Sequence, residues 1–286
     1  MGLGGSTKKW LNRGLRPLGV RLESLAAEKA ELARLLRVDA SGQFSRAVFP
    51  LLDSFSGCAP EAVLELVRKF KSERTPFLGD PSPTSFSYAN DYFSSPDAEV
   101  AYSIVRQFAP RAIVEVGSGN STRLLKAAIE AGGLATELIS VDPAPRVGVT
   151  GAADLRIAER VEELDPSFIP GKLGPGDILF VDSSHQVELG NDVLALLLGC
   201  FPRLRAGVLI HVHDIFLPFD YPREWIIDSG WRMGEQYLVH ALLMDSPRYE
   251  VLWAGHYFQR SLPDFAAHFD LATPARASSL WLRSRY

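Results

Sequence analysis

The chain has 286 residues and a mass of 31.5 kDa, with 47% hydrophobic residues, 22% charged residues and a net charge of −4. This composition can build a large core, which excludes a globally disordered chain, and the charge argues against nucleic acid as the main partner. No apolar run approaches the roughly 18 residues of a membrane span, and the two cysteines form no CxxC pattern. We therefore expect a cytoplasmic protein without a transmembrane segment, a disulfide scaffold or a thiolate zinc site.

The N-terminal segment is basic and amphipathic. Residues 1–37 contain eight Lys or Arg and three Glu, a net charge of +5. Apolar side chains are interleaved with these bases at Trp10, Leu11, Leu15, Leu18, Val20 and Leu22. The pattern is typical of a helix that binds a membrane surface or a partner, interrupted at Pro17 and Gly19. The alternative is an arm that packs on its own domain or on a sister subunit of a homo-oligomer.

The patterns along the chain divide it into three parts. Residues 24–37 and 59–73 have helical periodicity, which predicts a helical N-terminal extension over residues 1–73. Residues 74–96 are rich in Pro, Ser, Phe and Tyr without periodicity, so we expect a loop or linker there. The remainder, residues 97–286, is predicted to form one domain.

Helices and strands alternate in this last part. A helix is predicted over residues 97–108, and Pro110 stops it. Strands are predicted over residues 112–116, 137–142, 155–161, 177–182, 207–216, 249–258 and 279–286. Further helices are predicted over residues 121–132, 187–201 and 235–245. The alternation predicts a doubly wound α/β domain with a mostly parallel sheet and an antiparallel hairpin at one edge.

In such sheets, ligands bind beyond the carboxyl ends of the strands. The first strand ends in Glu115-Val116-Gly117-Ser118-Gly119, and its two glycines allow the backbone to approach a ligand closely. The spacing GxGxS differs from the dinucleotide fingerprint GxGxxG, and an acid two residues before the first glycine suits an amine-bearing ligand. The alternative is an ordinary Gly-rich turn between a strand and a helix.

The second strand ends at Asp142, whose carboxylate can accept hydrogen bonds from a ribose diol. Asp142-Pro143 is equally the start of a simple turn. Together, VEVGSGNSTRLL and ISVDPAPR resemble motifs I and II of class I S-adenosylmethionine (SAM)-dependent methyltransferases. The later segments GDILFVDSSHQVELGNDV, PRLRAGVLIHVHDIFLPFDYPREW and WRMGEQYL resemble a narrower family within that class. The resemblance covers residues 97–260 and implies a seven-stranded Rossmann-like sheet whose last strand is antiparallel.

The resemblance also implies a SAM site at the ends of these strands. The methionine part of SAM would lie along Glu115, Gly117 and Gly119. Asp142 would bind the ribose hydroxyls, and Arg160 and Val161 would lie near the adenine. The implied SAM-binding residues are Glu115, Gly117, Ser118, Gly119, Ser121, Thr122, Asp142, Val161 and Asp182. Hydroxyls at 118, 121 and 122 either donate to the cofactor carboxylate or cap the following helix.

Histidines gather in the two loops that follow the fourth and fifth strands. His185 follows Asp182, and His211-Val212-His213-Asp214 ends the fifth strand. Several buried ionisable groups are costly without a partner, so these residues are candidates for a site and not only for core packing. The strand period places His211 deeper in the sheet than His213, so we expect His211 to be structural. His213 and Asp214 are expected to reach the mouth of the sheet.

This arrangement resembles metal-dependent catechol-type O-methyltransferases. Those enzymes carry an acid after strand four, an acid–amide pair after strand five as Mg²⁺ ligands, and a general base three residues after the first acid. The resemblance implies a divalent metal (Mg²⁺, Mn²⁺ or Fe²⁺) at Asp182, His213 and Asp214, with His185 as the general base. Imidazole departs from the all-oxygen pattern and suits Mn²⁺, Fe²⁺ or Zn²⁺ better than Mg²⁺. Without a metal, His185 or His213 must remove the acceptor's proton alone, so the candidate catalytic residues are His185, Asp182 and His213.

Further candidates surround this region. Glu235-Gln236-Tyr237 is expected to line the acceptor pocket or to add a carboxylate beside the metal, and the alternative is that Glu235 satisfies a helix dipole. The aromatic segment 216–225 is expected to form a lid or a subunit interface. Weaker candidates of the same kind lie in the 74–96 loop at Tyr88, Tyr92 and Phe93.

These patterns favour one function over two alternatives. The first is SAM-dependent methyl transfer, to a hydroxyl group of a small molecule or glycan. The second is metal-dependent oxidation or hydrolysis on the same fold, because two carboxylates and a histidine can also form a non-haem iron site. The third is a SAM- or nucleotide-binding module without catalysis. The glycine motif and Asp142 favour the first and third, whereas the histidine cluster favours the first and second.

Overall fold

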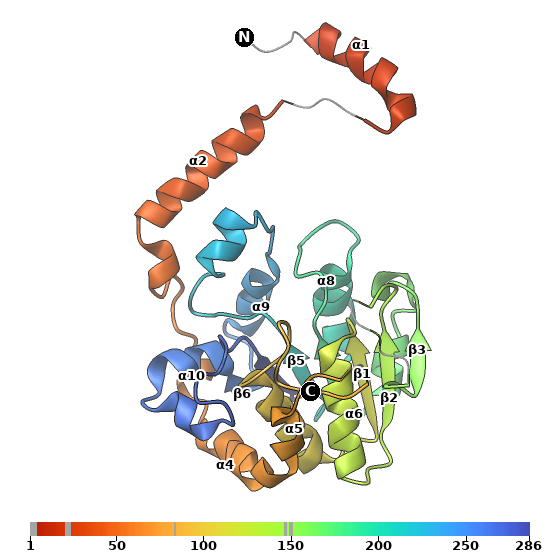
Figure 1. The fold of residues 1–286 in the computed structure, drawn as a ribbon, viewed down its shortest axis with the longest axis vertical. Coiled ribbons are helices and arrows are strands. Elements are labelled where there is room, and N and C mark those ends of the chain that lie inside the picture. The colour runs from red at the N-terminus through yellow and green to blue at the C-terminus, as the bar shows by residue number, and fades with distance from the viewer. Residues whose placement is uncertain (1–4, 21–23, 83, 146–147, 149–150) are drawn as a thin grey trace. The chain divides into compact units, whose positions relative to one another are not determined.

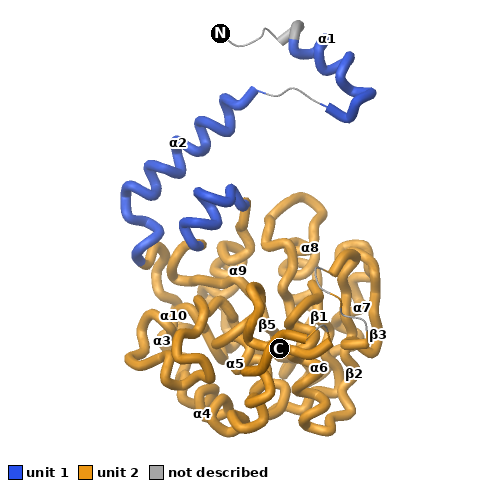
Figure 2. Tube along the Cα trace, viewed as in Figure 1, with its two compact units in different colours: residues 1–46, 222–231 blue, residues 47–221, 232–286 orange. Residues whose placement is uncertain are grey.

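The computed structural model describes residues 5–20, 24–82, 84–145, 148 and 151–286 (Figure 1). The chain divides into two compact units (Figure 2). The smaller unit comprises residues 1–46 and 222–231, and the larger comprises residues 47–221 and 232–286. Leu22, which is predicted to belong to the amphipathic segment, lies outside the described residues.

The smaller unit is helical. It contains α1 (Gly5–Leu15), η1 (Arg16–Leu18), α2 (Ala26–Ala40), η2 (Gln43–Ser45) and the π-helical turn η7 (Glu224–Asp228). The Arg223 guanidinium donates to Asp39 at 2.8 Å and to Asp228 at 3.0 Å, which ties the end of α2 to η7. The predicted helix over 24–37 is confirmed. The observed helix begins two residues later and ends three residues later than predicted.

The larger unit is built on a seven-stranded sheet of order β3-β2-β1-β4-β5-β7-β6. Its strands are β1 (Ala112–Val116), β2 (Glu137–Val141), β3 (Leu155–Ile157), β4 (Ile178–Val181), β5 (Leu209–Val212), β6 (Tyr249–Ala254) and β7 (Leu280–Ser284). Strands β1 to β5 pair in parallel, and β7 is antiparallel to both β5 and β6. The predicted α/β class, with a mostly parallel Rossmann-like sheet and an antiparallel last strand, is confirmed.

Helices cover both faces of the sheet (Figure 1). They are α3 (Asp53–Ser56), α4 (Glu61–Lys69), η3 (Lys71–Leu78), α5 (Asp97–Phe108), α6 (Asn120–Ala131), α7 (Phe168–Lys172), α8 (Asp192–Leu194), the π-helix η5 (Ala195–Cys200), α9 (Glu235–Leu243) and α10 (Gly255–Ser261). Every residue of β1, β4 and β5 is buried. Burial on both faces explains why these strands read as almost continuous apolar runs. No helix of the described chain is long and apolar enough to cross a membrane.

Three elements differ from the prediction. The strand predicted over 249–258 ends at Ala254, because Gly255 begins α10 and packs so closely that a Cβ there would lie 3.0 Å from the Ser279 carbonyl oxygen. The strand predicted over 155–161 has only three residues at the sheet edge, where mostly exposed side chains give it little packing. The antiparallel pair at the other edge is present, but residues 255–279, which include α10, connect its strands in place of a hairpin turn.

Residues 74–96 pack as part of the larger unit. Phe77, in η3, contacts the rings of Phe86 and Tyr88 with centroids 5.1 and 5.9 Å apart, and all three are buried. The aromatic side chains of this segment therefore contribute to the core of the larger unit. The division at residues 73 and 96 stays a prediction about domain organisation.

Candidate functional site

A cavity of about 420 Å³ opens at the carboxyl ends of β1, β2 and β4 in the larger unit. It is lined by residues 116–121, 141–144, 160–162 and 182–184, together with Tyr92, Phe93, Gln186, Glu188, Asn191 and Asp192. Most of the predicted SAM-binding residues are therefore brought together. Glu115 and Thr122 are the two that do not line the cavity.

The turn after β1 requires glycine at position 117. Gly117 has φ +86°, and a Cβ there would overlap the backbone carbonyl of Asp182. Its N–H donates to the Val141 carbonyl at 3.1 Å. The ends of β1, β2 and β4 can therefore meet around the cavity only because position 117 has no side chain.

Asp142, at the end of β2, is held in place by the backbone. One of its carboxylate oxygens accepts the Ser118 N–H at 2.7 Å and the other accepts the Ala144 N–H at 2.7 Å. The bond from Ala144 is the turn contact expected if Asp142-Pro143 begins a simple turn. Because each carboxylate oxygen can accept more than one hydrogen bond, the group can hold the turn and still accept bonds from a diol in the cavity.

Glu115 acts on the loop and does not face the cavity. It is fully buried, and its two oxygens accept hydrogen bonds from Ser121 Oγ at 2.7 Å and Thr122 Oγ1 at 2.6 Å. Thr122 Oγ1 also accepts the Gly119 N–H at 2.9 Å, so this residue caps α6. Burial raises the pKa of Glu115 to about 8. The motif resemblance implies that Glu115 contacts the ligand directly. In the structure its carboxyl group instead holds the start of α6.

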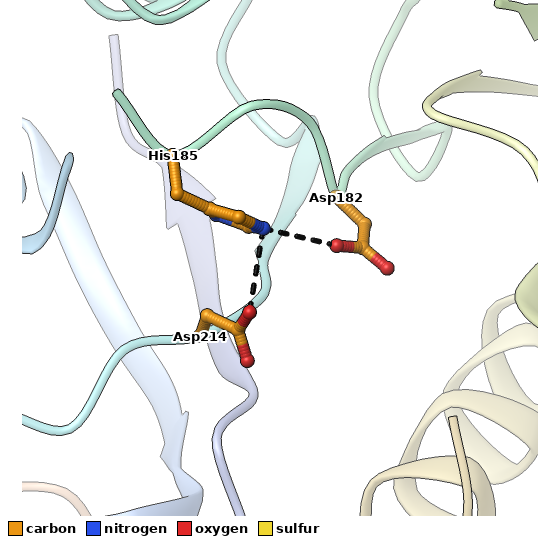
Figure 3. Close-up of side chains that lie close together, drawn as sticks. All are labelled: Asp182, His185 and Asp214. Carbon is orange, nitrogen blue, oxygen red and sulfur yellow. Dashed lines mark ion pairs between the residues drawn. The ribbon is translucent and has the colours of Figure 1, made fainter. Parts of the chain in front are cut away.

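A second polar group lies beside the cavity, where Asp182, His185 and Asp214 converge (Figure 3). His185 Nε2 is 3.3 Å from Asp182 Oδ1 and 3.3 Å from Asp214 Oδ2. His185 and Asp214 have φ values of +58° and +57°, in the left-handed region that few residues other than glycine adopt. Such strained positions persist where the surroundings hold them, and they often mark functional sites.

Glu235, the first residue of α9, holds the other side of the imidazole. Its Oε2 is 2.9 Å from His185 Nδ1, and the Glu235 N–H donates to the His185 carbonyl at 3.2 Å. Burial lowers the pKa of His185, but the hydrogen bonds that its ring donates to Asp182 and Glu235 and the charge of Asp214 outweigh it. The pKa of His185 therefore lies well above its ordinary value. Glu235 Oε1 is buried with no hydrogen-bond partner among the described residues.

The three converging side chains fit a divalent cation. Asp182, His185 and Asp214 each offer one ligand atom, and these atoms lie within 4.8 Å of one another. Metal-binding histidines usually donate their other ring N–H to a carboxylate, as His185 can to Glu235. Two carboxylates and one imidazole suit Mn²⁺, Fe²⁺ or Zn²⁺. The cluster as a whole can therefore hold a cation and fix its histidine ligand.

His213, predicted as a ligand, lies next to this group but outside it. Its Nε2 is 3.8 Å from Asp214 Oδ1 and 3.3 Å from Ser278 Oγ. The structure thus places His185, and not His213, together with the two carboxylates. Burial lowers the pKa of His213, and the charges of Asp182, Asp214 and Asp97 outweigh this effect and raise it.

Asp97 and Ser278 are functional-site neighbours that the sequence analysis does not identify. Asp97 begins α5, is buried, and accepts the backbone N–H groups of Ser278 at 2.8 Å and Ser279 at 3.2 Å. Ser278 Oγ in turn donates to Asp214 Oδ1 at 3.2 Å. These residues are 181 positions apart and carry no motif, so only the tertiary structure reveals the contact. His211, as predicted, is deeper, with its ring stacked on Phe180 and 3.1 Å from Ser279 Oγ.

The remaining candidates separate into cavity residues and packing residues. Tyr92 and Phe93 line the cavity, whereas the buried Tyr88 donates to Asp270 at 2.7 Å. Gln236 is buried and accepts the Phe216 N–H, and its own N–H donates to Tyr221 Oη. These bonds fix residues 216–221 against α9, so in this structure the segment packs within the larger unit. Trp225 belongs to the smaller unit.

Most residues that line the cavity, together with Asp182, His185 and Asp214, lie within a stretch that matches a family model. A family model described as a methyltransferase domain matches residues 114–215, just over a third of the chain. No curated protein matches the chain.

Solved structures similar to the chain include an SAH-bound methyltransferase, PaMTH1, from Podospora anserina. It has 17% identity and a TM-score of 0.41, over 93% of this chain and 100% of that one. The SAM complex of the O-methyltransferase TomG from Streptomyces achromogenes has 13% identity and a TM-score of 0.43, over 83% and 93%. An SAH complex of an O-methyltransferase from Bacillus cereus has 12% identity and a TM-score of 0.37, over 98% and 99%.

Proposed function

We propose that the protein transfers a methyl group from SAM to a hydroxyl group of a small molecule or glycan. The observation that carries the proposal is the meeting of the glycine turn after β1 with Asp142 after β2 around one cavity. The match of residues 114–215 to a methyltransferase domain supports it, because this stretch contains both features. The cavity volume of about 420 Å³ also suits a small organic ligand.

SAM is proposed to lie across the strand ends in an extended form. Its methionine part lies along Gly117–Gly119, where the backbone can approach closely. Asp142 accepts hydrogen bonds from the ribose hydroxyls, and Arg160 and Val161 border the adenine. This placement uses cavity residues only, so it assigns Glu115 and Thr122 to holding the loop and not to contacting the cofactor.

The cluster beside the cavity is proposed to serve the acceptor. A divalent cation bound there would lower the pKa of an acceptor hydroxyl that it contacts. Asp182, His185 and Asp214 would hold the cation, and Glu235 fixes the imidazole with Nε2 toward the two carboxylates. Asp182 also lines the cavity, so it lies where the cofactor and acceptor sites adjoin.

A histidine general base without a cation is the alternative within this proposal. A base must be unprotonated at the working pH, but the pKa values of both His185 and His213 are raised by the surrounding carboxylates. The raised pKa values oppose the role of general base for both rings. His185 is assigned as a cation ligand on geometry, because its Nε2 faces both carboxylates, and a cation there would displace the proton that this nitrogen otherwise holds. The cation would in turn make the acceptor hydroxyl more acidic.

Calorimetric titration with SAM and SAH tests the cofactor part of the proposal. The Asp142→Ala variant is expected to bind SAM about tenfold or more weakly, because the ribose hydroxyls lose a charged acceptor. Asp80→Ala, which removes an exposed carboxylate outside the cavity, is the matched control and should bind SAM like the parent protein. Unchanged SAM affinity in Asp142→Ala would contradict the placement, and no SAM binding by the parent protein would contradict the function.

A further inference from the structure

Helix α1 of the smaller unit has a basic face and an apolar face. On a helix with 3.6 residues per turn, Lys8, Lys9 and Arg13 fall within one half of the circumference. Trp10, Leu11 and Leu15 fall within the other half. The separation is therefore complete over the 11 residues of the helix, as in helices that lie in a membrane–water interface.

Charge and exposure extend this pattern beyond the helix. Residues 5–20 contain four basic side chains, the last at Arg16, and no acidic one. Trp10 is 75% exposed and Leu18, in η1, is 74% exposed. None of the four bases pairs with a carboxylate among the residues that the structure describes. The segment thus presents apolar side chains and unneutralised positive charge together.

An isolated helix of this length needs a surface to cover its apolar face. Helices shorter than about 12 to 15 residues are marginal in water, since the few hydrogen bonds barely repay the cost of nucleation. Helix α1 has 11 residues, and Gly14 near its end lowers its intrinsic stability further. Contact with a complementary surface would supply the missing stabilisation.

We propose that α1 binds the surface of a membrane that contains anionic phospholipids. The apolar side chains enter the boundary between headgroups and acyl chains, with Trp10 at the headgroup level, while the basic face contacts the phosphates. Each basic side chain near an anionic surface strengthens binding about fivefold. The four bases therefore supply a large part of the attraction, and the apolar face adds to it and sets the orientation of the helix.

A protein partner fits the same segment less well. The four apolar side chains of residues 10–18 expose an area on the order of a few hundred Å², below the roughly 800 Å² that each partner of a stable complex buries. A second copy of α1 fits least, because a two-fold contact through the apolar faces would leave both basic faces uncompensated. A lipid surface needs neither a large area nor a complementary shape.

Vesicle sedimentation with the full chain tests this proposal, using phosphatidylcholine vesicles with and without about one-third phosphatidylglycerol. We expect binding to the anionic vesicles only, weakened by added salt. The Lys9→Glu/Arg13→Glu variant should bind about 25-fold or more weakly, since two attractive charges become repulsive. Trp10→Ala/Leu15→Ala should bind about tenfold or more weakly.

Lys29→Glu is the control, because it reverses a basic charge at an exposed position of α2, outside the helix that is proposed to bind. It should keep most of the affinity for anionic vesicles. SAM binding and the thermal unfolding midpoint show that each variant still folds. Absence of binding to anionic vesicles, or equal losses in Lys29→Glu and Lys9→Glu/Arg13→Glu, would overturn the proposal. So would a concentration-dependent dimer, seen by light scattering, that Trp10→Ala/Leu15→Ala dissociates.

Discussion

The two polar regions at the carboxyl edge of the sheet differ in how complete they are. Around β1 and β2, all four carboxylate oxygens of Glu115 and Asp142 already accept hydrogen bonds from the neighbouring chain. Beyond β4 and β5, carboxylates from three elements surround the single imidazole of His185. One oxygen of Glu235 there has no hydrogen-bond partner in the described part of the chain.

The region around β1 and β2 is thus formed by local chain geometry. The region beyond β4 and β5 gathers carboxylates that a bound cation would neutralise. The first region is held by backbone N–H groups and hydroxyls, so it is ordered before any ligand binds. The second concentrates negative charge in a buried place, which is costly unless a cation shares it. Binding of the cofactor and of the cation should therefore be separable by mutation.

The largest effect is expected for Gly117→Ala. This change forces an L-residue to φ +86° and pushes its Cβ into the carbonyl of Asp182, so the free energy of unfolding should fall by about 3 kcal/mol or more. Gly176→Ala is the control, because Gly176 has φ +83° and open space around it, so only the cost of about 1 kcal/mol for the backbone remains. Equal losses in denaturant unfolding would show that the close approach is unimportant.

Asp214→Ala separates the two regions most cleanly. Affinity for Mn²⁺ should fall more than about 100-fold, because a charged ligand is lost. SAM affinity should change less than about threefold, since Asp214 does not line the cavity. Asp264→Ala, an exposed aspartate with a similar φ of +54°, controls for the backbone conformation. Parallel loss of SAM and Mn²⁺ binding in calorimetry would refute the separation.

Glu235→Gln tests whether the buried carboxylate tunes the histidine ligand. Loss of its charge should weaken Mn²⁺ binding about 10- to 100-fold, because His185 becomes a poorer and less oriented ligand. Glu61→Gln, at the same first position of α4, controls for the interaction with a helix dipole. If both variants bind Mn²⁺ like the parent protein, Glu235 serves only the helix.

The smallest effect is expected for Glu115→Gln. Since Glu115 does not line the cavity, SAM affinity should change less than about threefold, provided that the loop remains bonded to the amide oxygen. The same titration on Asp142→Ala shows how much SAM affinity is lost when a residue in direct contact is removed. A loss in Glu115→Gln as large as in Asp142→Ala would mean that Glu115 touches the cofactor after all.

The sequence predicts the first region better than the second, for a physical reason. Gly117, Asp142 and the apolar runs before them are neighbours in the chain, so strand patterns and turn chemistry indicate their places. The contact of His185 with Glu235 joins residues 50 positions apart, and its geometry depends on two left-handed residues and on where α9 begins. Periodicity contains no information on these features. For this reason the sequence predicts His213 as the ligand beside Asp182 and Asp214, whereas the structure has His185 there.

The ordering of the last strands shows the same limit. The sequence predicts that the sheet closes with two antiparallel neighbours, but not that β7 lies between β5 and β6 with α10 in the connection. That arrangement brings Ser278, just before β7, against Asp97 and Asp214. Residues supplied by such long-range pairing are the ones that the motifs leave out.

Titration of SAM into chelator-treated protein, repeated after addition of Mn²⁺, tests the central claim most directly. The account predicts SAM binding with a micromolar Kd in both titrations, and separate binding of Mn²⁺ that Asp214→Ala removes. The absence of SAM binding in both titrations would contradict it, since the cavity at the ends of β1 and β2 would then not be a cofactor site.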